Sequence, residues 1–150
     1  MTHHAAVVRM IRSLLDAQRL GVLSTHCRGH PYASLVAYGV TDDFSRLFFA
    51  TPRSTRKYAN MTEDDRVAML IDSRSNAEAD FHEARAVTIT GRVSEPGEDA
   101  AAPLKALFLS RHPYLCDFVT APSCAFMVVK VRRCIFVERF QNVTEIEVSP

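Results

Sequence analysis

Much of this chain consists of short stretches in which apolar and polar residues alternate with a period of two. Residues 32–41 and 85–94 show the alternation most clearly, and turn-forming residues bound both stretches. A period of two places alternate side chains on opposite faces of a β-strand. Further strands are predicted over residues 21–26, 46–51, 66–72, 124–131, 134–140 and 144–148. Residues 32–41 and 46–51 are separated only by a turn, so we expect them to be adjacent antiparallel strands.

Three other segments have the apolar spacing of helices, namely residues 4–18, 57–64 and 99–111. In the last of these, Leu104, Leu107 and Phe108 are expected to face inward. The polar stretch 73–83 is predicted to form a loop. Because the strands follow one another with few helices between them, the pattern favours a mostly antiparallel barrel of six or seven strands, with helices at its edges.

The length of 150 residues and the 47% hydrophobic content suit one domain, residues 1–150, with a single core. The formal net charge of +1 gives no reason to expect nucleic acid as a partner, so any cationic site must be local. No apolar run is long enough to span a bilayer, and the polar start of the chain does not resemble a secretory signal. We therefore expect a cytoplasmic protein with no membrane partner.

The residues that most often bind metals or perform nucleophilic catalysis are scattered. The four cysteines lack the close pairing of a zinc site and are interpreted as reduced packing residues. His26, His30, His82 and His112 are expected to be exposed. No metal site is predicted, and no nucleophile and base are paired in the sequence.

Residues 124–129 are apolar throughout, so a strand formed by them has no polar face. Both faces of that strand must therefore be covered. The barrel interior covers one face, and either a helix or a second subunit covers the other. We favour a second subunit, because the chain has few helices to spare.

The stretch TPRSTRKYANM, residues 51–61, places three cations at a predicted change from strand to helix. A helix N-terminus already carries partial positive charge and unpaired N–H groups. Cations there are unfavourable unless an anion lies among them. Arg, Lys, hydroxyl groups and helix N–H groups together are the donors that a phosphate dianion requires. A solvated basic turn is the alternative interpretation of these residues.

The order of these elements, with the segments PYASLVAYGV and RLFFATPRSTRKYANM, resembles the FMN-binding split-barrel superfamily of pyridoxamine phosphate oxidase. The resemblance covers about residues 15–140. It implies a split β-barrel that forms a homodimer, with FMN bound at the subunit interface. It also implies a flavin-dependent oxidoreductase, in which the flavin carries the redox step and the protein binds and orients the reactants. Its substrate is unknown.

The resemblance assigns FMN contacts to individual residues. Arg56 and Lys57 match the phosphate-binding Arg-Lys pair, Thr55 matches the hydroxyl residue before it, and Thr51 matches the residue at the strand end. The strand whose backbone edges the isoalloxazine ring corresponds to Ser34, Leu35, Val36 and Ala37. By contrast, Arg53 precedes this unit and is expected to point into solvent.

The chain also departs from the oxidases of this superfamily. Ser34 stands in place of an Arg and Ala86 in place of a Gln, and the Arg-x-His pair and the closing segment of the oxidases are missing. We therefore expect pyridoxamine 5'-phosphate to be a poor substrate. Two alternatives remain open. One is a haem-binding or haem-degrading protein that uses His26, His30 or His82, and the other is a flavin-binding stress or sensor protein without turnover.

Overall fold

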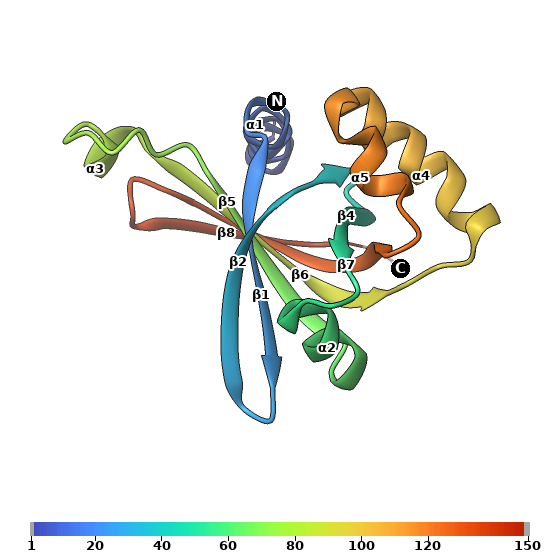
Figure 1. Cartoon of the computed structure of the whole chain (residues 1–150). Helices are drawn as coiled ribbons and strands as arrows, with labels where there is room; N and C mark the ends of the chain where they lie inside the picture. The colour runs from blue at the N-terminus through green and yellow to red at the C-terminus, as the bar shows by residue number, and fades with distance from the viewer. Residues whose placement is uncertain (1, 149–150) are drawn as a thin grey trace.

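The computed structural model describes residues 2–148, in which the strands form one curled antiparallel sheet (Figure 1). The strands are β1 (Leu20–Cys27), β2 (His30–Ala37), β3 (Gly39–Val40), β4 (Arg46–Pro52), β5 (Arg66–Asp72), β6 (Arg85–Ser94), β7 (Cys124–Glu138) and β8 (Asn142–Glu147). Their spatial order is β2-β1-β5-β6-β7-β4-β3, and β8 pairs with β7. The predicted split barrel is confirmed, and β8 corresponds to the strand that was predicted over residues 144–148.

The helices lie around the edges of this sheet, as predicted. They are α1 (His3–Ala17), α2 (Arg56–Glu63), α3 (Asp80–Glu83), α4 (Glu98–Arg111) and α5 (Cys116–Thr120), with a 3₁₀ turn η1 (Pro113–Leu115) between the last two. Thr2 begins α1 as an N-cap, because its side chain accepts a hydrogen bond from the backbone N–H of Ala5 at 3.1 Å. Helix α3 occupies part of the stretch that was predicted to be entirely loop.

The predicted strand over residues 32–41 is broken at Tyr38 into β2 and β3. β2 pairs with β1 through a two-residue turn, whereas only β3 pairs with β4. The expected adjacency of residues 32–41 and 46–51 therefore holds for the last residues alone. The break occurs because the Tyr38 ring enters the core and its hydroxyl donates to backbone carbonyl groups at the end of α1, including Leu15 at 2.7 Å. Gly39 follows because a side chain there would collide with the Phe48 ring.

The predicted strands over residues 124–131 and 134–140 are one continuous strand, β7. Along its length β7 changes one of its neighbours. Residues Cys124 to Lys130 pair with β4, and residues from Arg133 onward pair with β8. The adjacent arginines at 132 and 133 therefore mark a change of partner and not the end of a strand.

The side chains of β7 divide the core into two parts. Ala125, Met127 and Val129 point into the barrel, where they meet α1 and the inward faces of the other strands. Phe126 and Val128 point to the opposite side, where they pack against a cluster from α4, α5 and β4: Phe48, Ala101, Phe108 and Val119. The prediction that a second subunit covers this face is wrong, because α4 and α5 of the same chain cover it (Figure 1).

Helix α4 makes this contact through a narrow stripe. Ala101 and Phe108 are buried and Leu104 is half-buried, whereas Leu107 is 50% exposed. The predicted inward position of Leu107 is therefore wrong. A helix turns by about 100° per residue, and the stripe that meets the sheet here is centred on Ala101, Leu104 and Phe108, which leaves Leu107 at its side.

Candidate functional site

The corner between β4 and α2 is held together by two threonines. Thr51 is fully buried, and its Oγ1 lies 2.9 Å from that of Thr55. Thr55 donates its hydroxyl proton to the Pro52 carbonyl at 2.9 Å and accepts from the backbone N–H of Tyr58, so it caps α2. One of the two hydroxyls donates to the other, and the Thr51 hydroxyl also lies 3.3 Å from the Pro52 carbonyl oxygen. These bonds fix where α2 begins and leave the N–H groups of its first two residues facing outward.

Arg56 and Lys57 are the first two residues of α2, and their side chains enter different hollows. Lys57 lines a cleft of about 330 Å³ together with Leu35, Val36 and Ala37 of β2. Arg56 lies over the Tyr32 ring, 5.9 Å from its centroid, in a hollow beside the β1–β2 turn. Successive helical residues point about 100° apart, which accounts for the separation. The structure thus brings Lys57, but not Arg56, into the cleft along β2.

Ser34 lies on β2 between these two hollows. Its Oγ is buried and has no hydrogen-bond partner among the described residues. A buried hydroxyl without a partner costs about 1–3 kcal/mol, so a ligand atom that hydrogen-bonds to it would be stabilised. Ser34 therefore lies on β2 next to Leu35, which lines the cleft, and carries a hydroxyl with no partner among the described residues.

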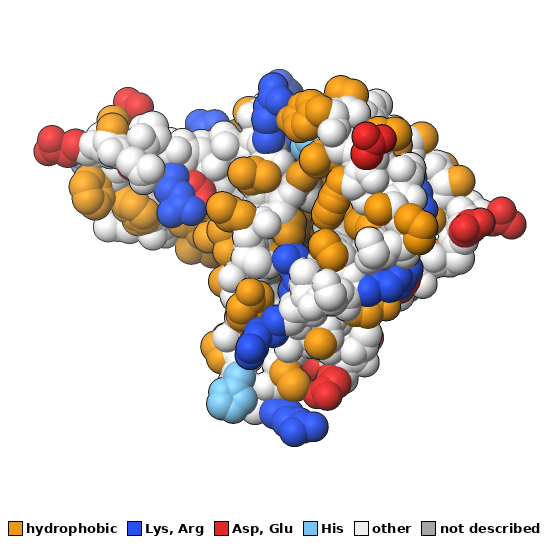
Figure 2. Space-filling model, viewed as in Figure 1, with side chains coloured by type: hydrophobic (Ala, Val, Ile, Leu, Met, Phe, Trp, Pro, Cys, Tyr) orange, Lys and Arg blue, Asp and Glu red, His pale blue; other side chains and the backbone are white. Residues whose placement is uncertain are grey.

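Sequence reasoning identified one wall of the cleft and missed the other. Ala50 and Pro52 of β4 extend the wall formed by β2. The opposite wall comes from the last turns of α4, from η1 and from α5, and it consists of Phe108, His112, Tyr114, Leu115, Phe118 and Val119. Hydrophobic side chains gather on both sides of the hollow in Figure 2, between β2 and the helices. The apolar residues around Pro113 were the available signal, but they indicate burial and do not specify which strand they face.

His112 is buried and not exposed as predicted, with 1% of its surface accessible. Its Nε2 lies 2.8 Å from the Tyr38 carbonyl oxygen, and its ring packs 4.9 Å from that of Phe108. A carbonyl only accepts, so Nε2 carries the proton and Nδ1 of the neutral ring is an acceptor. Burial lowers the pKa of His112, and the nearby charges of Arg111 and Arg19 lower it further. The cleft therefore contains a neutral imidazole.

Arg111 ties the same wall to α1. Its Nη2 donates to the backbone carbonyls of Leu15, at 2.6 Å, and of Gln18, and its guanidinium lies over the Tyr38 ring. Those carbonyls belong to the C-terminal end of α1, where the helix dipole favours a cation. Burial is the main cause that raises the pKa of Tyr38 to about 12, so its hydroxyl remains a donor at neutral pH. This contact fixes the position of the helical wall relative to β2 and β3.

Arg53 is exposed, as predicted, but its guanidinium has partners. Its guanidinium forms an ion pair with Glu95, with Nη2 2.6 Å from Oε2, and also donates to the Tyr58 hydroxyl at 3.1 Å. The Arg53 hydrogen bond is the largest cause that lowers the pKa of Glu95. Arg53 is thereby neutralised outside the cleft, and of the three cations that follow β4 only Lys57 lines it.

The remaining histidines and cysteines form no common site. His26 lies 3.0 Å from Asp64, His30 begins β2, and His82 lies on α3 in a separate arm of the molecule (Figure 1). All four cysteines are free, and only Cys134 is fully buried, while Cys116 is exposed. No group of metal-ligating side chains occurs within residues 2–148. None of the helices in that range is long and apolar enough to cross a membrane.

Comparison with known proteins identifies the fold. The chain resembles a heme binding protein from Mycobacterium smegmatis (TM-score 0.82, 20% identity), over 98% of this chain and 59% of that one. It resembles a FAD-binding protein from Mesorhizobium loti (TM-score 0.70, 19% identity), over 85% of this chain and 90% of that one. A putative pyridoxamine 5'-phosphate oxidase from Listeria innocua aligns with a TM-score of 0.66 and 15% identity, over 87% of this chain and 98% of that one.

These likenesses are below 25% identity and concern the fold alone. The chain spans about three-fifths of the Mycobacterium smegmatis protein. No curated protein matches its sequence. The family model described as pyridoxamine 5'-phosphate oxidase matches residues 8–138, which is most of the chain and contains β1 to β7. This chain therefore belongs to the pyridoxamine 5'-phosphate oxidase family.

Proposed function

We propose that this protein binds FMN in the cleft along β2 and acts as a flavin-dependent oxidoreductase in the cytoplasm. The observation that carries the proposal is the polarity of the cleft. Its walls are mostly apolar, two cations, Arg19 and Lys57, line it, and among the described residues no Asp or Glu does. A planar apolar ring with an anionic tail fits such a site, and the volume of about 330 Å³ is within the range for small-molecule sites.

The phosphate end of the flavin would lie at the beginning of α2. Lys57 supplies a charge there, and the first backbone N–H groups of α2 supply donors. Arg56 would reach the same phosphate from its own side, across the unpartnered hydroxyl of Ser34. Thr51 and Thr55 hold the corner on which these donors depend.

The ring would lie along Leu35, Val36 and Ala37. Backbone groups of β2 provide the polar contacts there, so the contact does not require the Arg that Ser34 replaces. A bound flavin supplies a ring that accepts or donates a hydride, and the protein residues bind and orient the reactants. His112 would hold the cleft wall in place behind a bound molecule, through its bond to the Tyr38 carbonyl.

We further propose a homodimer, on the basis of the outer face of the sheet. Leu35 is opposite Val22, and Val22 is opposite Leu70, so the three form one apolar row across β2, β1 and β5. Leu35 is 68% exposed and Leu70 is 36% exposed. A second copy that covers this row would exclude water from it and would close the open side of the cleft at Leu35.

Haem binding is the second candidate, because a structurally similar protein is named as a heme binding protein and the cleft is apolar. His112 is the histidine in that cleft, but its Nε2 is engaged with Tyr38 and its ring is buried. Haem could be bound by His112 only if a packed side chain were displaced. A flavin-binding stress or sensor protein without turnover is the third candidate, and it requires the same flavin site.

The experiment is a titration of the purified protein with FMN, riboflavin and haem, followed by flavin fluorescence and by the Soret absorbance of haem. We expect FMN to bind at least about tenfold more tightly than riboflavin, since one charge-assisted bond contributes roughly 1.5–3 kcal/mol. Equal affinity for FMN and riboflavin would contradict a phosphate site. A Soret shift at lower ligand concentration than flavin quenching would favour haem.

A further inference from the structure

The outer face of the sheet has a cationic hollow where β5 begins and β6 ends. Its volume is about 760 Å³, and four cations of three neighbouring strands line it: Arg66, Arg92, Lys130 and Arg132. The first two have aspartate partners. Lys130 and Arg132 form no ion pair with any described Asp or Glu, and the one carboxylate among the described lining residues, Glu147, is already paired with Arg133. The hollow therefore has positive charge that its own chain does not balance.

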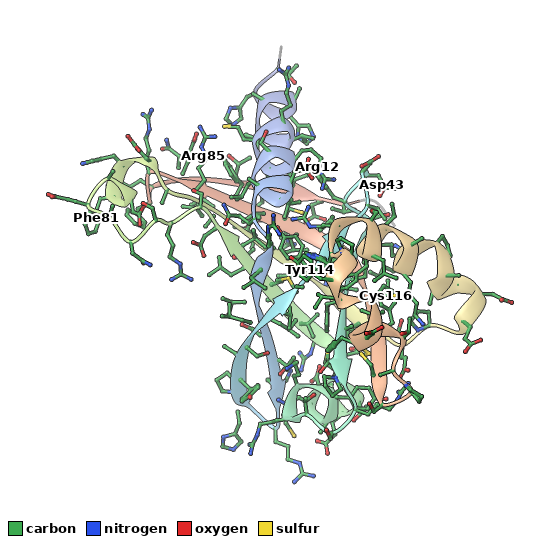
Figure 3. All side chains as sticks on the ribbon, turned by 45° about the horizontal axis from the view of Figure 1, so that its top comes forward. Arg12, Asp43, Phe81, Arg85, Tyr114 and Cys116 are labelled. Carbon is green, nitrogen blue, oxygen red and sulfur yellow. The ribbon has the colours of Figure 1, made fainter. Side chains whose placement is uncertain are left out.

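The opposite end of the same face continues into an arm, residues 73–84, which connects β5 to β6. The arm contains α3 and projects from the sheet beside the β7–β8 turn (Figure 1). Phe81 of the arm packs against Phe140 of that turn, with ring centroids 6.0 Å apart, and both are 63% exposed. The two rings line a hollow of about 590 Å³ together with Leu70. In Figure 3, Phe81 lies on the opposite side of the molecule from Cys116 of α5, so the helices that cover β7 leave these rings open.

The arm is acidic as well as apolar, because residues 73–84 contain three carboxylates and one arginine. Asp80 accepts hydrogen bonds from backbone N–H groups of the arm, and Arg74 is paired with an aspartate of β5. Glu78 and Glu83 are exposed and form no ion pair with any described cation. Figure 2 shows carboxylates at the tip of the arm and hydrophobic side chains along its lower side. Arg139, in the adjacent turn, offsets at most one of these charges, so negative charge remains on the arm.

Two copies that cover the apolar row of Leu35, Val22 and Leu70 can meet face to face in two ways. A two-fold axis parallel to the strands would place each end of the face against the same end of the second copy, so the two cationic hollows would repel one another. An axis along the row, across the strands, exchanges the two ends. It places the acidic arm of each copy at the cationic hollow of the other, and opposite charges favour this arrangement.

The distances along β5 agree with this exchange. The row crosses β5 at Leu70, between Arg66 at the hollow and the beginning of the arm. At the usual rise of a strand, Arg66 lies about 13 Å from Leu70 on one side, and the arm begins about 10 Å away on the other. An axis through Leu70 therefore brings the arm of the second copy close to the hollow. Pro31, Ala68 and Val148 also line the hollow and give it apolar surface on which a ring can pack.

We propose that, in the homodimer, the arm of each copy docks in the cationic hollow of the other. Phe81 lies on the apolar surface of the hollow, and Glu78 and Glu83 lie beside Lys130 and Arg132. The inference rests on the proposed homodimer, and it adds which segment of the second copy each face holds. It also fixes the orientation, because the strands of the two facing sheets then run in opposite directions.

The test is analytical ultracentrifugation over a range of protein concentrations, which gives the dissociation constant of the dimer. Lys130→Glu with Arg132→Glu places carboxylates opposite carboxylates, and Glu78→Lys with Glu83→Lys places cations opposite cations. Each double variant should raise the dissociation constant about tenfold or more. The fourfold variant restores opposite charges with their places exchanged, so its dissociation constant should return to within about threefold of the wild-type value.

Two controls separate docking from a general effect of charge or of apolar surface. Glu98→Lys with Asp99→Lys changes two exposed acids at the start of α4, on the other side of the molecule (Figure 1). Combined with the two changes in the hollow, they give the same net charge as the fourfold variant but should not restore the dimer. Phe81→Ser should weaken the dimer, whereas Leu107→Ser, on the exposed side of α4, should not. Thermal unfolding of each variant checks that the fold is retained.

Unchanged dimer affinity in both double variants, or a fourfold variant that dimerises no better than they do, would overturn the docking of the arm and leave the homodimer in place. A wild-type protein that is monomeric at micromolar concentration would overturn both. FMN titration of the same proteins tests the flavin site separately. A dimer that responds to the charge changes but binds no FMN would support the docked arm and contradict the flavin site, and FMN binding by a dimer that does not respond would do the reverse.

Discussion

The Nε2 atom of His112 lies 2.8 Å from the carbonyl oxygen of Tyr38, the residue at which the second strand breaks. This bond joins the helical wall of the cleft to the strand wall at one buried point. It satisfies a carbonyl that the interrupted sheet leaves unpaired. The cleft therefore depends on a histidine that is neutral in the folded protein.

We predict that acidification destabilises the protein through His112. Burial lowers the pKa of its ring below the ordinary value of 6.5, so below that pH the unfolded chain binds more protons than the folded one. The stabilisation is present above about pH 6.5 and is lost as the pH falls toward the lower, folded pKa. Urea unfolding between about pH 7.5 and about pH 5.5 measures it. His112→Gln should reduce this pH dependence, whereas His30→Gln, at the exposed start of β2, should not. An unchanged pH dependence in His112→Gln would contradict the prediction.

Lys57→Ala should weaken FMN binding by about tenfold or more, the effect of one charge-assisted bond, and leave riboflavin binding nearly unchanged. Arg56→Ala should act in the same direction but less strongly, because Arg56 does not line the cleft. Arg53→Ala is the control, since Glu95 neutralises Arg53 outside the cleft. Titration followed by flavin fluorescence gives the FMN and riboflavin affinities of all three variants. A larger loss of FMN affinity in Arg53→Ala than in Lys57→Ala would mean that the phosphate lies elsewhere.

Ser34→Ala should affect the stability of the protein and its FMN binding in different ways. Its hydroxyl is buried without a partner, so its removal should leave the free energy of unfolding unchanged or raise it. The same change should weaken FMN binding if the hydroxyl bonds to the ligand. Ser24→Ala, on the exposed face of β1, is the matched control for both measurements. A Ser34→Ala protein that is less stable and binds FMN normally would show that Ser34 has a structural partner instead.

Leu70→Lys should convert the proposed dimer into a folded monomer, because it places a charge in the apolar row of the outer sheet face. Val143→Lys is the control, since Val143 is 59% exposed on β8. Light scattering at micromolar protein concentration gives the mass of each. A wild-type protein that is only monomeric would contradict the dimer.

Val128→Asp should behave differently from Leu70→Lys. Val128 is covered by helices of its own chain, so a buried carboxylate there should lower the free energy of unfolding by several kcal/mol. Thermal unfolding measures this loss, which should occur whether or not the protein is a dimer. A stable monomeric Val128→Asp protein would contradict the packing of α4 and α5 on β7.

The sequence by itself determined the fold class and the places of most strands, but neither the break at Tyr38 nor the continuity of β7. β5 and β6 were predicted with their observed bounds, because alternation is a local property that a strand with one buried face must show. The start of α2 was predicted one residue late, at Lys57, and the cap that fixes it is local, because Thr55 bonds to the backbone N–H of Tyr58 three positions on. Lys57 was identified from its match to the Arg-Lys pair of the FMN-binding superfamily and from the cations at the predicted change from strand to helix.

Only the tertiary structure decided what covers β7 and what forms the second wall of the cleft. An apolar run such as residues 124–129 requires cover on both faces, but burial does not specify which element supplies it, and here α4 and α5 do. His112 belongs to the cleft because it meets Tyr38 from 74 residues away in the sequence, and Arg19 belongs to it because it meets Tyr114 from 95 residues away. Local patterns extend over a few residues, whereas contacts between distant segments form only when the whole core packs.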